Sequence, residues 1–129
     1  MNADQFQNLA EQALNALPER FRLAMENVVI VVEDRADVEV MRSMQLDSPY
    51  DLLGLYEGHP LTVREGGGGG SLPDMIRLYR EPILCMSRQT DEPVGDCIAD
   101  VLIHEVGHYF GFSDAEMEEI ESARAEAEK

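Results

Sequence analysis

Two histidines and a glutamate in the C-terminal quarter of the chain have the types and spacing of a metal site. His104, Glu105 and His108 form the pattern H-E-x-x-H. On a helix, residues four apart project from the same face, so both imidazoles can reach one zinc ion. Glu105 is offset around the helix, where a carboxylate can take a proton from a zinc-bound water without binding the metal. The pattern therefore predicts a catalytic zinc site.

A glycine and an aspartate extend this pattern. Gly111 lies just past the second histidine, where a glycine can adopt the left-handed conformation that ends a helix and turns the chain. The turn would return Asp114 to the histidines as an oxygen ligand. Three protein ligands and a water are the catalytic pattern of zinc, whereas four protein ligands are typical of structural sites. We therefore expect Asp114 to be the third ligand.

The short H-E-x-x-H pattern also arises by chance in helices, and Asp114 has a second interpretation. Ser113 and Glu116 form a capping box for a last helix. Asp114 would then favour the positive end of that helix. The two roles of Asp114 are compatible, and the motif spacing favours the ligand role.

The full pattern H-E-x-x-H-x-x-G-x-x-D resembles the metzincin signature with an aspartate in place of the third histidine. The whole chain is similar to a family of short zincin-like metallopeptidases found in bacteria, a minimal relative of the metzincins. Three further stretches carry the resemblance, namely residues 28–34, 52–58 and 76–80.

The resemblance implies a zinc metallopeptidase that hydrolyses peptide bonds of a peptide or protein substrate. It implies one zinc ion per chain, held by His104, His108 and Asp114, with Glu105 as the general base. An alternative of another class is a zinc-binding protein-interaction module that retains the site with little or no proteolytic activity. Longer metzincins place a methionine turn downstream of the third ligand. Here the candidates to lie beneath the metal are Met86 and Met117.

Length and composition narrow the class of protein. With 129 residues, 44% hydrophobic, the chain is expected to form one domain, residues 1–129. The net charge of −16 argues against nucleic acid and anionic membranes as partners. No apolar run approaches a membrane span, and the polar N-terminus has no signal-peptide pattern. Cys85 and Cys97 lack C-x-x-C spacing. We expect a cytoplasmic monomer with reduced thiols.

The expected fold is α+β, a small mixed twisted sheet of three to four strands packed against an N-terminal helix and the H-E-x-x-H helix. Hydrophobic periodicity predicts the N-terminal helix over 3–17 and the motif helix over 90–110. A short helix or turn is expected over 81–87, and a last helix over 113–127. Residues 65–72, with five consecutive glycines, are expected to form a flexible loop. The expected strands are 28–32, 52–57, 61–64 and 75–80.

Further residues could support the metal site. Asp100 precedes His104 by one helical turn and could accept a hydrogen bond from its ring, although a solvated position is the alternative. Tyr109 follows Glu105 by one turn, and packing is the simpler role for it. An extended substrate could pair with the strand over 75–80, which would align its carbonyl with the metal.

Overall fold

A mixed sheet forms the centre of the fold in a computed structural model that describes residues 1–58 and 73–127. Strand β1 (Val28–Glu33) runs parallel to β3 (Asp74–Tyr79), and β2 (Gly54–Glu57) runs antiparallel to β3. The strand order within the described residues is β1-β3-β2. The expected α+β fold with a small mixed sheet is confirmed. The strand expected over 61–64 and the glycine-rich loop lie outside the described residues.

Strand β3 is the central strand, which overturns one expectation. It pairs with β1 along its whole length and with β2 from Met75 to Leu78. Both edges of its backbone are therefore used, and a substrate cannot pair with it. In the part of the chain that the structure describes, β2 is the sheet edge on the side of the motif helix, because β2 packs against α6 whereas β1, the other edge, packs against α1.

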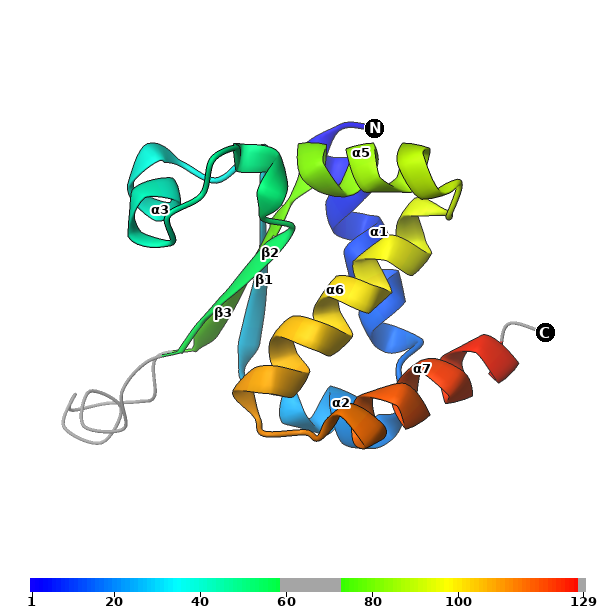
Figure 1. The fold of residues 1–129 in the computed structure, drawn as a ribbon. Helices are drawn as coiled ribbons and strands as arrows, with labels where there is room; N and C mark the ends of the chain where they lie inside the picture. The colour runs from blue at the N-terminus through cyan, green and yellow to red at the C-terminus, as the bar shows by residue number, and fades with distance from the viewer. Residues whose placement is uncertain (59–72, 128–129) are drawn as a thin grey trace, which may run out of the picture.

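Helices α1 (Ala3–Asn15) and α6 (Val94–Tyr109) cover one face of the sheet (Figure 1). Helix α1 lies over β1, and α6 lies over β2. Asn2 begins α1 with a capping box, and the buried stripe of α1 includes Phe6 and Ala10. Strand residues Ile76 and Leu78 are fully buried on the same face. The main core therefore lies between the sheet and the motif helix, and it holds that helix in place.

The opposite face of the sheet has a smaller apolar cluster and an ion-pair group. Helix α3 (Val38–Ser43) and the 3-10 turn η1 (Pro49–Asp51) precede β2. Tyr79 is fully buried here in a cluster with Ala36 and Leu52. Arg77 of the central strand β3 forms ion pairs with Glu33 of β1 and Glu57 of β2. Its Nε lies 2.9 Å from Oε1 of Glu57.

Helix α5 (Arg80–Thr90) directly follows β3 and is longer than the turn or short helix expected at 81–87. Pro82 lies in its first turn, where a missing N–H costs no helical hydrogen bond. The helix ends at Asp91, which has φ of 57°. The prediction that the motif helix begins at Thr90 is therefore wrong, since Thr90 belongs to α5 and α6 begins only at Val94.

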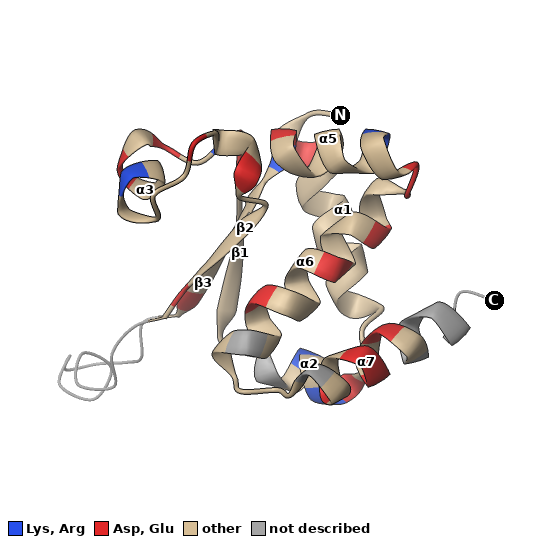
Figure 2. Cartoon of the chain, in the orientation of Figure 1, with Lys and Arg blue, Asp and Glu red and all other residues tan. Residues whose placement is uncertain are grey.

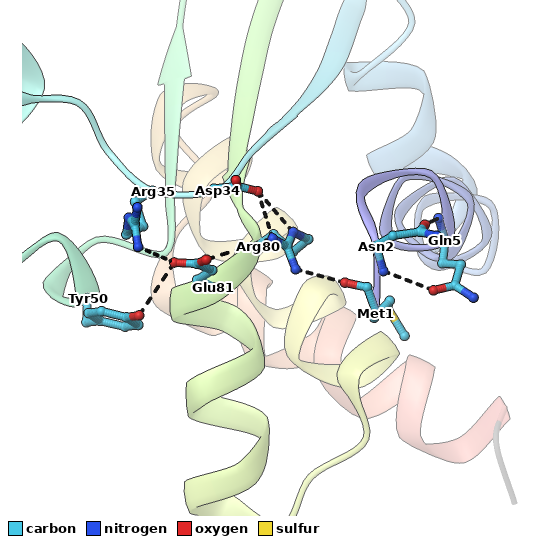
Figure 3. Close-up of polar contacts among 8 residues, drawn as sticks. All are labelled: Met1, Asn2, Gln5, Asp34, Arg35, Tyr50, Arg80 and Glu81. Carbon is cyan, nitrogen blue, oxygen red and sulfur yellow. Dashed lines mark hydrogen bonds and ion pairs between the residues drawn. The ribbon is translucent and has the colours of Figure 1, made fainter.

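Polar contacts fix the start of α5 against the chain terminus (Figure 3). Arg80 donates hydrogen bonds to Oδ1 of Asp34, the shorter at 2.8 Å, and to the carbonyl oxygen of Met1 at 2.8 Å. The neighbouring Glu81 accepts from Arg35 at 2.7 Å. The strand-to-helix junction is thus tied to both the N-terminus and the loop after β1. The other two helices in the described part of the chain are α2 (Glu19–Ala24) and α7 (Asp114–Ala127).

Candidate metal centre

Helix α6 carries the H-E-x-x-H pattern as one continuous helix. Its core face carries the buried residues Val101, Leu102 and Val106. His104 and Glu105 lie outside that stripe, with about half of the His104 side chain exposed. His108 lies one turn further along the same helix, as expected. Its side chain lies outside the described residues, so its ligand role stays a prediction.

The chain turns sharply after α6, as the sequence predicts. Gly111 has φ of +77°, the left-handed conformation expected at the end of this helix. The backbone N–H of Phe112 donates to the carbonyl oxygen of Gly107 at 2.9 Å. Asp114 follows as the first residue of α7. The Asp114 side chain lies outside the description, so its role as third ligand also stays a prediction.

The capping box before α7 is present. The backbone N–H of Ser113 donates to Oε1 of Glu116, and the N–H of Glu116 donates to Oγ of Ser113, both at 3.1 Å. The hydrogen bonds with Ser113 hold the pKa of the Glu116 carboxyl below its usual value. The capping role therefore belongs to Ser113 and Glu116.

A pocket of about 320 Å³ opens beside the motif helix. His104 and Glu105 both line it, which brings the first predicted ligand and the predicted base to one cavity. Figure 2 shows acidic residues along α6 and α7, the two helices that contribute most of its charged lining. The lining residues are Leu53, Met86, Glu92, Asp100, Val101, His104, Glu105 and Glu121.

Glu121 is a site residue that the sequence patterns did not predict. Its Oε1 lies 2.7 Å from Nε2 of His104, and both side chains are partly exposed. Glu121 comes from α7, seventeen residues after His104 and beyond the end of the recognised motif. No spacing rule connects the two residues, because their distance depends on how α7 packs against α6.

The edge strand β2 approaches the motif helix very closely. A Cβ atom added to Gly54 would lie 2.7 Å from Cγ1 of Val101 and 3.6 Å from Cγ of Glu105. The absence of a side chain at Gly54 therefore lets the strand backbone lie directly beside the predicted base. Glycine suits this position, because it lets the backbone of a strand approach a neighbouring site closely.

The two candidate methionines have different places. Met86, from α5, lines the same pocket as His104 and Glu105. Met117 is buried against α6, and a Cβ atom at Gly107 would lie 2.6 Å from its sulfur. Gly107 lies inside the H-E-x-x-H pattern, so α7 packs directly on the motif through Met117.

Two other expected residues lie near the site. Asp100 lines the pocket with His104, and its predicted hydrogen bond to the His104 ring stays a prediction. Tyr109 stacks on Tyr56 of the edge strand, with ring centroids 4.0 Å apart, so its packing role is confirmed. Cys97 of the same helix is fully buried, and this burial raises the pKa of its thiol.

The donor atoms around the pocket fit zinc by their chemistry. Imidazole nitrogens and carboxylate oxygens are the ligands that zinc accepts in catalytic sites. Among the described side chains, no three His, Cys, Asp or Glu residues form a ready metal cluster. Two of the three predicted ligands, His108 and Asp114, have side chains outside that description. Among the described donors, Nε2 of His104 and Oε1 of Glu121 lie 2.7 Å apart.

Comparison with known proteins yields one family. A family model described as zincin-like metallopeptidase matches residues 25–124, more than three quarters of the chain. The matched range includes the sheet, the pocket, the whole H-E-x-x-H-x-x-G-x-x-D pattern and Glu121. No curated protein matches the chain. The resemblance seen in the sequence and the zincin-like fold it implied are both confirmed.

Proposed function

The chain belongs to the zincin-like metallopeptidase family, and from this premise we propose that it hydrolyses peptide bonds with one bound zinc ion. The observation that carries the proposal is the common pocket of His104 and Glu105 beside the sheet edge. In this proposal His104, His108 and Asp114 hold the metal. Their positions on α6 and at the start of α7, joined by the left-handed Gly111, support that ligand set.

The proposed mechanism assigns proton transfer to Glu105. A zinc ion held by these ligands would polarise the substrate carbonyl and lower the pKa of a water to about 7. Glu105 orients the attacking water by a hydrogen bond and accepts its proton. It then gives that proton to the leaving amine. Glu105 suits this task because it lines the pocket next to a ligand and need not bind the metal itself.

The edge strand β2 is the proposed guide for the substrate backbone. An extended peptide can add to an open strand by backbone hydrogen bonds, without dependence on its side chains. Gly54 brings β2 to within contact of Glu105, so a peptide paired with β2 would pass over the pocket. This replaces the pairing with β3 that the sequence suggested.

Metal content tests the proposed site directly. The purified wild-type chain should carry or take up about one zinc ion, measured by elemental analysis after dialysis against metal-free buffer. His104→Ala and His108→Ala should each lose most of this zinc, because each removes one of three proposed ligands. Asp96→Asn is a suitable control, since Asp96 is an acidic residue of α6 that lines a different pocket. A wild-type chain that takes up no zinc would refute the proposal.

A further inference from the structure

Glu121 lies beside the first predicted zinc ligand, although no motif includes it. Its Oε1 is 2.7 Å from Nε2 of His104. Two donor atoms that share a tetrahedral zinc ion at about 2.0–2.1 Å lie roughly 3.3 Å apart. The two side chains are therefore placed in nearly the same way whether Nε2 of His104 and Oε1 of Glu121 share a proton or bind the same zinc ion. A small opening of the pair is enough to convert one arrangement into the other.

The pair also lies at the right place in the pocket. His104 and Glu121 line both the main pocket and a second pocket of about 260 Å³ next to it. The two side chains thus form part of the wall between these cavities. Both remain partly exposed, with 53% and 34% of their side-chain surface accessible, so an ion from solvent can reach them.

Helix α7 holds Glu121 in this position through apolar anchors. Met117, one turn earlier, packs on Gly107 of the motif, and Ile120 is almost fully buried. On the outer side, Arg20 of α2 donates to the carbonyl oxygen of Glu116 at 3.4 Å and pairs with Glu119 at 3.6 Å. The Glu121 side chain therefore faces the H-E-x-x-H pattern because these contacts fix α7 against α6 and α2.

We propose that Glu121 is a fourth protein ligand of the zinc ion, opposite His104 on the wall of the pocket. This inference rests on the proposed zinc site and adds a residue to it. Four protein ligands are the pattern of a closed zinc site. Glu121 would therefore hold the fourth position on the metal at rest, and its carboxylate would exchange for water and substrate during turnover.

The test compares Glu121→Gln with Glu118→Gln. Glu118 lies on the same helix and lines the second pocket with His104, but its side chain is exposed. Zinc affinity is measured by competition with a chromophoric chelator, and Co²⁺-loaded protein is examined by visible absorption. Circular dichroism of each variant checks that it folds.

We expect Glu121→Gln to weaken zinc binding by at least about tenfold and to shift the Co²⁺ absorption bands. Glu118→Gln should match wild type in both. Wild-type affinity in Glu121→Gln would overturn the ligand assignment while leaving the three-ligand site intact. A weaker affinity with an unchanged Co²⁺ spectrum would also overturn it, because Glu121 would then only orient His104. A wild-type chain without zinc would refute this inference together with the proposed function.

Discussion

Glu105 and Asp114 have separable tasks in the proposed site, one in proton transfer and one in metal binding. Glu105 lines the pocket beside the edge strand, and Asp114 opens α7 after the left-handed turn. Ser113 and Glu116 already provide the reciprocal cap of that helix. A change at Asp114 therefore tests metal binding with little effect on the start of the helix.

Asp114→Ala should weaken zinc binding strongly, whereas Asp114→His should restore it, because histidine is the third ligand in the longer metzincin signature. Zinc affinity by chelator competition is the measurement, with thermal unfolding to follow stability. If Asp114 only favours the helix start, both variants should cost at most about 1 kcal/mol of stability. Unchanged zinc affinity in both would remove Asp114 from the ligand set.

Tyr79 is a residue whose pKa depends on the fold. Burial raises the pKa of its hydroxyl to about 12, with a smaller contribution from Glu33 that Arg77 partly offsets. In the unfolded chain the pKa of tyrosine is about 10. The folded state keeps the proton after the unfolded state has lost it. The stability from this difference is fully present below about pH 10 and declines as the pH rises toward 12.

Tyr79→Phe should therefore reduce the loss of stability between pH 7 and pH 11 by about 1–1.5 kcal/mol, roughly half of the full difference for a two-unit pKa shift. Near pH 7 the variant should be at least as stable as wild type, because the buried hydroxyl has no hydrogen-bond partner among the described residues. Tyr56→Phe is the control, since Tyr56 donates to Asp74 at 2.6 Å and should lose about 1 kcal/mol near pH 7. Urea unfolding at pH 7 and pH 11 measures both. Parallel alkaline losses in wild type and Tyr79→Phe would refute this explanation.

At the scale of elements, the contact between β2 and α6 decides whether an edge strand can lie beside the base. That contact depends on one glycine, because a Cβ at Gly54 would also lie 3.2 Å from the backbone oxygen of Arg77. The strand is thus confined between the helix on one side and β3 on the other. A larger residue has to move one of these elements.

Gly54→Ala should destabilise the chain by about 1–3 kcal/mol through overpacking against Val101. It should also lower peptidase activity more than Val101→Ala does, because the displaced strand no longer lies against Glu105. Adding Val101→Ala to Gly54→Ala should recover part of the lost stability, and urea unfolding of the four proteins gives the coupling energy. Strictly additive effects would show that the two residues do not constrain each other.

The sequence predicted those elements whose signals are local. The strand expected from residue 75, the turn at Gly111 and the cap at Ser113 all depend on neighbouring residues, and the structure confirms them. Arg80, expected to continue the strand, instead begins α5. The edge position of β2 was missed because strand order depends on pairing between distant segments. Glu121 was missed for the same reason, since its place depends on the packing of α7.

At the scale of the whole molecule, the acidic charge is the dominant property. The net charge is −16, and acidic residues lie along α6 and α7 (Figure 2). Asp100, Glu105 and Glu121 of these helices line the pocket. This charge remains the basis of the prediction that nucleic acid is not a partner. Within the described ranges, no helix is long and apolar enough to cross a membrane. The same acidic surroundings favour cations, which is consistent with a metal site at His104.

The central claim is that this molecule is a zinc peptidase with Glu105 as its base, and Glu105→Gln tests it most directly. Glutamine keeps the size of the side chain but cannot accept the proton. Hydrolysis of a mixed peptide pool is compared between wild type, Glu105→Gln and the control Asp96→Asn at matched zinc occupancy. We expect Glu105→Gln to fold, bind zinc nearly as wild type does and lose activity by at least about a hundredfold. Equal cleavage by wild type and Glu105→Gln would contradict the mechanism, and zinc binding without cleavage by either would favour a protein-interaction module.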